Sequence, residues 1–241
     1  MSNNKLDILA FAAHPDDVEL SCGGTLIKHI AMGYSVGIVD LTQGELGTRG
    51  TADTRKSEAD GAGKIIGISA RENLMMSDGF FENNIENKLK IIAAIRKYQP
   101  DVVFANAIRD RHIDHGRASS LVEDACFLSG LTKVETIFDN KIQKAWRPKV
   151  VYHYIQDRFI IPDFVIDISN HWEHKLKAIR AFKTQFHDPE STEPQTPISG
   201  LDFMEFLESR AREFGRYIGA EFGEGFTVSR PAGVPDITKL I

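Results

Sequence analysis

The sequence has few of the features that mark secreted, disulfide-rich or membrane proteins. Only 2 of its 241 residues are cysteines, and neither belongs to a C-x-x-C pair. Cys22 and Cys126 fall on separate predicted helices, which indicates buried, reduced thiols. No apolar run approaches the roughly 20 residues that a membrane-spanning helix needs. We see no signal peptide before the first predicted strand, so we expect a cytoplasmic protein without a membrane partner.

Basic runs are also missing from the sequence. Lys and Arg number 29 against 34 Asp and Glu, which gives a net charge of −5. Binding to a phosphate backbone needs a basic patch, so nucleic acid is not an expected partner. Hydrophobic residues make up 42% of the chain, enough for a full core. With no internal repeat and no clear linker, we expect a single domain over residues 1–241.

The order of the predicted elements indicates the fold class. Apolar runs typical of buried strands cover residues 6–13, 35–42, 72–77 and 101–106. Helical patterns follow them at residues 23–32, 54–67, 85–98 and 116–128. This alternation predicts an α/β, Rossmann-like fold, with a mostly parallel sheet and helices on both faces. In the usual strand order, 3-2-1-4-5, the first and fourth strands are neighbours.

The C-terminal part of the chain has a less regular pattern. Residues 149–155 and 164–169 resemble strands, and residues 170–186 and 201–222 resemble helices. Residues 188–200 hold three prolines and are predicted to form an exposed loop at the rim of a site. We expect residues 223–241 to be mostly irregular.

Two stretches rich in histidine and aspartate follow the first and fourth predicted strands. They are His14-Pro15-Asp16-Asp17 and His112-Ile113-Asp114-His115. The loops that follow parallel strands open on one edge of the sheet, and the two strands are expected to be neighbours. The sequence therefore predicts a metal site at the C-terminal edge of the strands.

The residue types in these stretches suit a hydrolytic zinc site. Such a site has three protein ligands and one open position. His14 and Asp17 lie in one tight turn and can reach the same ion, and His115 is the best candidate for the third ligand. Two imidazoles and one carboxylate leave the ion positive, which lowers the pKa of bound water towards about 7. We therefore predict one zinc ion per chain.

The remaining polar residues of the two stretches are candidates for catalysis. Asp16 lies beside a ligand without being needed as one, and can act as a general base. His112 can stabilise a developing oxyanion or protonate a leaving amine. Asp114 is predicted to orient the His112 imidazole and keep it charged. Together these groups could hydrolyse an amide.

Other functions use similar residues. Two histidines and one carboxylate also suit Fe(II), as in non-haem iron oxygenases, but the sequence lacks the short alternating strands of a jelly roll. A metal-binding module without catalysis is a further alternative. A serine hydrolase is disfavoured because the Gly-x-Ser-x-Gly pattern at residues 33–37 lies between a predicted helix and a predicted strand, and not at the strand-to-helix turn of a nucleophile elbow.

The two motifs resemble those of the PIG-L/LmbE-like zinc deacetylases. The resemblance lies in residues 13–17 with Glu19 and in His112-x-Asp114-His115, and it spans nearly the whole chain. Residues 42–50, 54–56 and 206–211 are similar to one branch, the deacetylases of bacillithiol biosynthesis, which act on N-acetylglucosaminyl-malate. In one respect the sequence departs from that branch: residues 194–198 contain no tyrosine, although close relatives carry one in this loop.

The resemblance implies a Rossmann-like fold and a homo-oligomer, commonly a hexamer. It implies a zinc ion on His14, Asp17 and His115, with Asp16 as the base and His112 as the acid or oxyanion partner. The reaction it implies is removal of an N-acetyl group from glucosamine, with release of acetate.

Two arginines are expected on the same edge of the sheet as the metal. Arg55 begins the helix after a glycine-rich loop, and Arg111 precedes His112. Arginine binds carboxylates bidentately, so these residues are candidates for binding the malate group. The expected substrate is thus a small amino-sugar conjugate, N-acetylglucosaminyl-malate. Free or oligomeric N-acetylglucosamine is the alternative.

Overall fold

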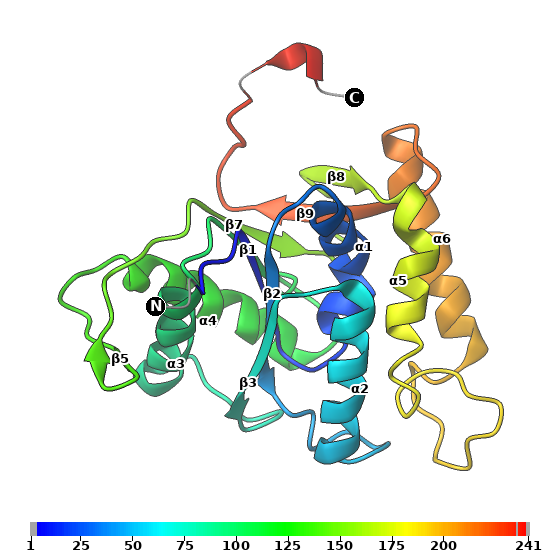
Figure 1. Cartoon of the computed structure of the whole chain (residues 1–241). Helices are drawn as coiled ribbons and strands as arrows, with labels where there is room; N and C mark the ends of the chain where they lie inside the picture. Colours follow the sequence, from blue (N-terminus) through cyan, green and yellow to red (C-terminus); the bar gives the residue numbers. More distant parts are fainter. Residues whose placement is uncertain (1–3, 235, 240–241) are drawn as a thin grey trace.

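The computed structural model describes residues 4–234 and 236–239, and a seven-stranded sheet lies at its centre (Figure 1). The strand order is β3-β2-β1-β4-β7-β9-β8, and a separate hairpin joins β5 to β6. The strands of the large sheet are β1 (Ile8–Ala12), β2 (Val36–Thr42), β3 (Ala70–Met76), β4 (Val102–Ala105), β7 (Val150–Tyr154), β8 (Phe164–Asp167) and β9 (Gly223–Val228). The hairpin strands are β5 (Ile137–Phe138) and β6 (Lys141–Ile142).

The sheet is mostly parallel, as predicted. Strands β1, β2, β3, β4 and β7 pair in parallel, whereas β9 runs antiparallel to both of its neighbours, β7 and β8. The predicted order 3-2-1-4-5 is confirmed, because the fifth predicted strand is β7, which pairs with β4. Strand β1 pairs with β4 in the register Ile8↔Val102. This pairing places the loops that follow the two strands next to each other.

Helices cover both faces of the sheet (Figure 1). They are α1 (Asp17–Ala31), α2 (Ala52–Ile66), α3 (Ile85–Tyr98), α4 (Ile113–Ser129), α5 (Trp172–Ile179) and α6 (Leu201–Tyr217), with short 3-10 turns η1 (Ser169–His171) and η2 (Ile237–Lys239). Helices α3 and α4 pack together on one side, and α1, α2 and α5 pack together on the other.

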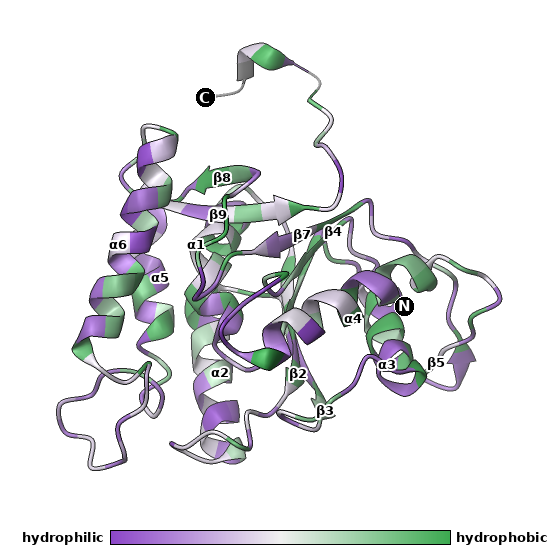
Figure 2. Ribbon diagram, turned by 180° about the vertical axis from the view of Figure 1, so that it is seen from behind, coloured by the Kyte–Doolittle hydropathy of each residue, from purple (hydrophilic) through white to green (hydrophobic). Residues whose placement is uncertain are grey.

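The alternation of side chains along β1 divides the core. Leu9 and Phe11 belong to the hydrophobic cluster on the α3–α4 side, whereas Ile8 and Ala10 belong to the cluster on the α1 side. Figure 2 shows the same arrangement by hydropathy, with hydrophobic strands inside and helices that carry both hydrophobic and hydrophilic residues. A third cluster joins α2, α5 and α6. Both faces of the central strands are thus buried, which explains their nearly continuous apolar sequences.

Two helices begin earlier than predicted. Helix α1 begins at Asp17 and not at Gly23, and α4 begins at Ile113 and not at Gly116. Gly24 lies inside α1, where a close contact requires a glycine: a Cβ there would lie 2.8 Å from Ile168 Cδ1. The earlier starts place parts of both predicted motifs in the first helical turns, at the edge of the sheet.

The prediction of an irregular C-terminal tail was wrong for β9, which inserts between β7 and β8. Its sequence lacks an apolar alternation because Gly223 packs against α6, where a Cβ would lie 2.8 Å from the Gly215 nitrogen. The predicted helix over residues 170–186 is also shorter, since α5 ends at Ile179. The β5–β6 hairpin was not predicted.

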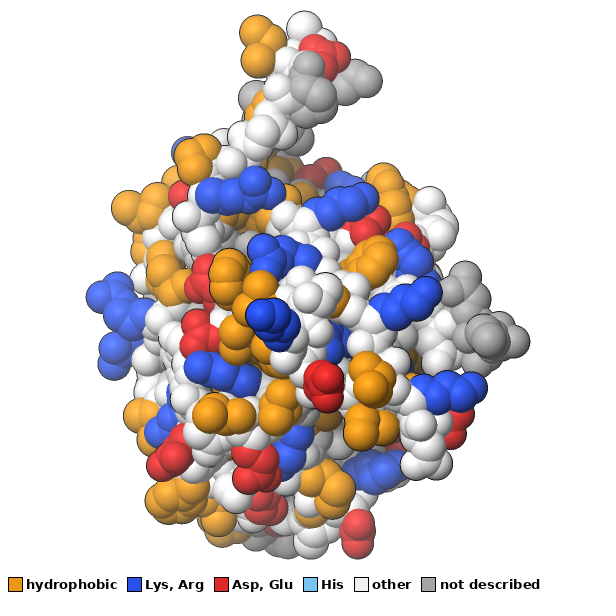
Figure 3. Space-filling view, turned by 90° about the vertical axis from the view of Figure 1, so that its left-hand side faces the viewer, with side chains coloured by type: hydrophobic (Ala, Val, Ile, Leu, Met, Phe, Trp, Pro, Cys, Tyr) orange, Lys and Arg blue, Asp and Glu red, His pale blue; other side chains and the backbone are white. Residues whose placement is uncertain are grey.

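Figure 3 shows one face of the molecule. There, acidic, basic and hydrophobic side chains are interspersed over the face that carries α3 and α4. Among the described residues, no helix is both long enough and apolar enough to span a membrane.

Candidate metal and catalytic site

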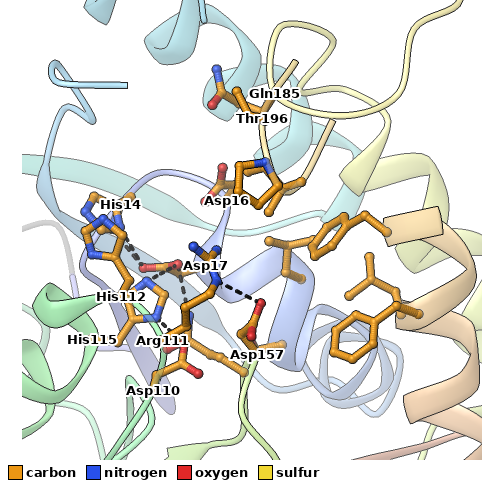
Figure 4. A pocket seen from close by; sticks show the side chains of 18 of the residues that line it. His14, Asp16, Asp17, Asp110, Arg111, His112, His115, Asp157, Gln185 and Thr196 are labelled. Carbon is orange, nitrogen blue, oxygen red and sulfur yellow. Dashed lines mark hydrogen bonds and ion pairs between the residues drawn. The ribbon is translucent and has the colours of Figure 1, made fainter. Parts of the chain in front are cut away.

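A cavity of about 500 Å³ opens at the C-terminal edge of β1 and β4 (Figure 4). Residues of both predicted motifs line one side of it, and residues of α6 line another. The loops over residues 43–51 and 188–200 contribute to the rim. All predicted site residues except Asp114 therefore line one cavity, and Asp114 is buried directly behind it against His14.

The three predicted metal ligands come together around the Asp17 carboxylate. Its Oδ2 lies 3.6 Å from His14 Nδ1, and its Oδ1 lies 3.1 Å from His115 Nε2. Ligand atoms bound tetrahedrally at zinc distances of about 2.0–2.2 Å are about 3.3–3.6 Å apart. Each distance is close to this range, but the two involve different oxygens of Asp17, so an ion shared by all three residues stays a prediction.

Further carboxylates orient the two imidazoles. His115 Nδ1 lies 2.5 Å from Asp110 Oδ2, which leaves Nε2 directed at Asp17. His14 Nε2 lies 3.1 Å from Asp78 Oδ1, which leaves Nδ1 on the side of Asp17. Partners of this kind fix the tautomer of a ligating histidine and raise its basicity. Both imidazoles are therefore held with one nitrogen available to a metal.

Two amides hold the Asp17 carboxylate from behind. Asn106 Nδ2 donates to Oδ2 over 3.0 Å, and Gln156 Nε2 donates to Oδ1 over 3.0 Å. The His14 main-chain N–H also donates to Oδ2, over 2.9 Å. The orientation of the carboxylate is thus set from β4, from the segment after β7 and from its own turn.

The carboxylates of the site stabilise positive charge at its histidines. Burial by itself would lower the pKa of His14, but hydrogen bonds to three carboxylates hold that pKa well above its usual value. Burial likewise opposes protonation of His115, but the Asp17 charge and Asp110 raise the pKa of His115 to about 9. The carboxylates around His14 are those of Asp114, Asp17 and Asp78. A divalent ion would supply the positive charge that this cluster stabilises.

His112 also lies close to the metal candidates. Ring nitrogens of His14, His112 and His115, one from each residue, lie within 4.8 Å of one another. Ligand atoms of His14, Asp78 and Asp114 also lie within 4.8 Å of one another. The ring centroids of His14 and His112 are 4.6 Å apart. His14 is common to every candidate set, and the assignment of Asp17 and His115 as its co-ligands stays a prediction.

Asp16 is buried at the start of α1, in an unusual backbone conformation with φ of 122°. Arg55 Nη2 donates to Asp16 Oδ2 over 2.9 Å and to the Pro15 oxygen over 2.5 Å, and Arg55 Nη1 donates to Gln185 over 3.0 Å. Burial raises the pKa of Asp16 to about 7, although Arg55 opposes this rise. A carboxyl group that titrates near neutral pH is suited to general-base catalysis.

The two predicted substrate-binding arginines both line the cavity. Arg55 is only 5% exposed, and its terminal nitrogens donate to Asp16, Pro15 and Gln185, so its guanidinium supports the candidate base. Its role in binding a substrate carboxylate stays a prediction. Arg111 has a side chain that is 45% exposed and pairs with Asp157 over 3.2 Å.

The predicted contact between Asp114 and the His112 ring is corrected by the hydrogen bonds. The Asp114 carboxylate accepts from the Gly79 N–H over 2.8 Å and from Arg117 over 2.7 Å, and it lies 3.4 Å from His14 Nε2. It is the Asp114 main-chain N–H that donates to His112 Nδ1, over 3.3 Å. This bond leaves the proton of a neutral His112 on Nε2.

Several polar residues of the site were not identified from the sequence. Asp78 follows β3 and Asp110 follows β4, so both lie at the edge where such residues are expected. Their positions were therefore a usable signal. Asn106, Gln156 and Gln185 gave no comparable signal, because amide side chains at loop starts are common.

The loop over residues 188–200 lies at the rim, as predicted. It is held to the glycine-rich loop, since the Gly50 N–H donates to Glu193 over 2.9 Å and Arg49 hydrogen-bonds to Ser191. In residues 194–198, which contain no tyrosine, Thr196 lines the cavity, and its Oγ1 is buried without a hydrogen-bond partner among the described residues.

Comparisons with known proteins agree with the motifs. Residues 9–126 match the PIG-L family, described as GlcNAc-PI de-N-acetylase. The structure is similar to that of the conserved protein TT1542 from Thermus thermophilus, with a TM-score of 0.84, 35% identity and coverage of 95% of this chain and 98% of that chain.

Two curated relatives carry functional names. A diacetylchitobiose deacetylase from Thermococcus kodakarensis is 26% identical, over 92% of this chain and 83% of its own length. A 4-oxalmesaconate hydratase from Pseudomonas putida is 25% identical, over 78% of this chain and 77% of its own length. The family match, the full-length similarity to the Thermus protein and the shared architecture lead to one conclusion. The chain belongs to the PIG-L family of N-deacetylases.

Proposed function

We propose that the protein is a zinc-dependent hydrolase that removes the N-acetyl group of N-acetylglucosaminyl-malate, with release of acetate and glucosaminyl-malate. The observation that carries this proposal is the arrangement around Asp17. Its Oδ2 lies 3.6 Å from His14 Nδ1, and its Oδ1 lies 3.1 Å from His115 Nε2. The residue before it, Asp16, is buried beside the same cavity. The family match to a de-N-acetylase supports the reaction.

The donor set fits zinc, with His14, Asp17 and His115 as the residues that would hold it. Zinc bound there would supply Lewis acidity, which polarises the amide carbonyl and makes water more acidic. Asp16 accepts a proton from the attacking water, because its pKa of about 7 leaves it partly ionised at neutral pH. Arg55 keeps the Asp16 carboxylate in one orientation through the 2.9 Å ion pair.

We assign His112 to the carbonyl side of the reaction. Burial, together with His14 and His115, lowers its pKa, so the free imidazole is neutral at pH 7. With Nδ1 accepting from the main chain, Nε2–H is the donor that His112 offers to the developing oxyanion. The proton taken up by Asp16 can then pass to the leaving amine, so that water is divided between acetate and the free amino sugar.

The malate conjugate is proposed on the similarity of residues 42–50, 54–56 and 206–211 to the bacillithiol branch. A second candidate is a deacetylase of oligomeric N-acetylglucosamine, and the similarity to a diacetylchitobiose deacetylase over 92% of the chain favours it. The two candidates share the scissile amide and differ in what is attached to the sugar.

The test is an acetate-release assay on protein reconstituted with zinc. N-acetylglucosaminyl-malate, diacetylchitobiose and N-acetylglucosamine are compared by kcat/KM, and hydration of 4-oxalmesaconate is measured in parallel because one relative is a hydratase. Higher kcat/KM for the malate conjugate supports the first candidate, and higher kcat/KM for diacetylchitobiose supports the second. Hydration without any acetate release would refute both.

A further inference from the structure

The cavity wall contains four cationic side chains, and three of them are already neutralised by carboxylates of the protein. Arg55 pairs with Asp16 over 2.9 Å, and Lys175 pairs with Glu224 over 2.6 Å. Arg111 pairs with Asp157 over 3.2 Å. The four cations are Arg55, Arg111, Lys175 and Arg210.

Arg210 of α6 is the cation in this wall that has no carboxylate partner within the described part of the chain. Its Nη2 donates to the main-chain oxygen of Asp157, and its Cζ lies 4.6 Å from the centre of the Phe206 ring. Its Nη1 is buried without a hydrogen-bond partner. Burial lowers the pKa of Arg210, although the more distant charges of Asp157, Asp110 and Glu213 oppose this shift. Desolvating a guanidinium without a counter-ion is costly, and an anionic ligand would offset that cost.

The position of Arg210 relates it to the reacting centre. Asp157 connects it to Arg111, since Arg111 Nε donates to the Asp157 side chain and Arg210 donates to the Asp157 main chain. Figure 4 shows Arg111 and Asp157 in the middle of the cavity, between the histidines and the orange ribbon of α6. Arg210 and Asp17 line the same cavity, so one ligand bound in it can contact both.

The surroundings of Arg210 suit a short carbon chain that carries the anion. Phe206, Leu207 and Phe214 line the same part of the cavity from α6. Phe214 is buried, and its ring contributes to an apolar wall. An apolar wall with one guanidinium can bind a small organic acid, because the carbon atoms contact the wall and the carboxylate meets the cation.

We infer that Arg210 binds a carboxylate on the group attached to the sugar and thereby gives the site its preference for anionic conjugates. This inference rests on the proposed deacetylase function and refines it, since Arg210 takes the role that the sequence had suggested for Arg55. The alternative is a purely structural role, in which Arg210 only supports the Asp157 main chain. Arg210 would then not distinguish charged from uncharged substrates.

The experiment compares N-acetylglucosaminyl-malate with its dimethyl ester, which has the same carbon skeleton without charge. Wild-type protein should favour the diacid in kcat/KM. Arg210→Met, which keeps a long apolar side chain on Phe206, should reduce that preference about 10- to 150-fold, the usual effect of a lost charge-assisted hydrogen bond. Arg210→Lys should restore part of it, because lysine keeps the charge but not the bidentate geometry.

The matched control is Arg212→Met, also on α6. Arg212 pairs with Glu208 over 2.9 Å and with Glu221 over 3.3 Å and does not line the cavity. This variant should retain the wild-type ratio of diacid to diester. Unchanged kcat/KM for the diester would show that Arg210→Met is folded and that its metal site is intact.

Two results would overturn the inference. One is an Arg210→Met protein that keeps the wild-type preference for the diacid. The other is loss of that preference in Arg111→Met but not in Arg210→Met. Binding of the product glucosaminyl-malate and of its dimethyl ester, measured by calorimetry, tests Arg210 without turnover. Equal affinity of wild-type protein for the two would refute the anionic subsite, whereas absence of deacetylation with intact selective binding would refute only the proposed reaction.

Discussion

Replacement of Arg55 by methionine tests how the fold sets the proton affinity of the candidate base. In the structure Arg55 Nη2 lies 2.9 Å from Asp16 Oδ2, and both side chains are buried. Burial raises the pKa of Asp16 to about 7, and the positive charge of Arg55 opposes that rise. Without the guanidinium the carboxylate loses its main favourable partner, so its pKa should rise further.

The expected size follows from that contact. One adjacent arginine typically lowers a carboxyl pKa by about 1–3 units. Because the ionised form of Asp16 is the active base, the acidic limb of the kcat profile should move to higher pH by the same amount. Starting from a pKa of about 7, the ionised fraction at pH 7 would fall from about one half to between about one tenth and one thousandth. The value of kcat at pH 7 should then fall about 5- to 500-fold and recover as the pH rises.

The assay is the pH dependence of kcat for zinc-loaded protein between pH 5 and pH 10, with both N-acetylglucosamine and the malate conjugate. The loss should be the same for the two substrates, since Arg55 acts on the shared base. Lys56→Met is the control, because Lys56 is exposed and pairs only with Asp60 on the surface of α2. An unmoved acidic limb, or a loss confined to the malate conjugate, would refute the assignment of Arg55 to Asp16.

Three further predictions concern the metal and the base. Removal of metal by a chelator should abolish acetate release and added zinc should restore it, so full activity in protein shown to be metal-free by elemental analysis would contradict the mechanism. Asp16→Asn should reduce kcat by roughly 10²–10⁴ while the zinc content stays near one per chain; loss of zinc would instead make Asp16 a ligand. Asp110→Asn should weaken zinc binding about 10- to 100-fold, measured by competition with a chromogenic chelator, because Asp110 orients His115 at 2.5 Å; unchanged affinity would show that this contact does not support the ligand.

Local sequence patterns were sufficient for the central sheet and for the edge that carries the site. Alternating strands and helices predicted parallel pairing, and the pairing of β1 with β4 brought His14 and His115 together as expected. These features depend on periodicity and on the handedness of βαβ connections, both of which act over short stretches of chain. Strand β9 was not predicted, because a glycine-containing strand has no regular alternation of apolar side chains in its sequence. Its apolar contacts come from the neighbouring strands and helices.

By itself, the sequence determined which residue types are available for catalysis and the sheet edge at which they lie. Only the tertiary structure decided which of them are partners. Arg55 supports Asp16 across 39 residues, and the Asp114 carboxylate contacts His14 and not the His112 ring. Arg210 reaches Asp157 across 53 residues, which leaves it in the cavity wall without a carboxylate partner in the described chain. Such contacts depend on the path of loops and on the packing of α6, and a buried charge takes whichever partner the packing brings within reach.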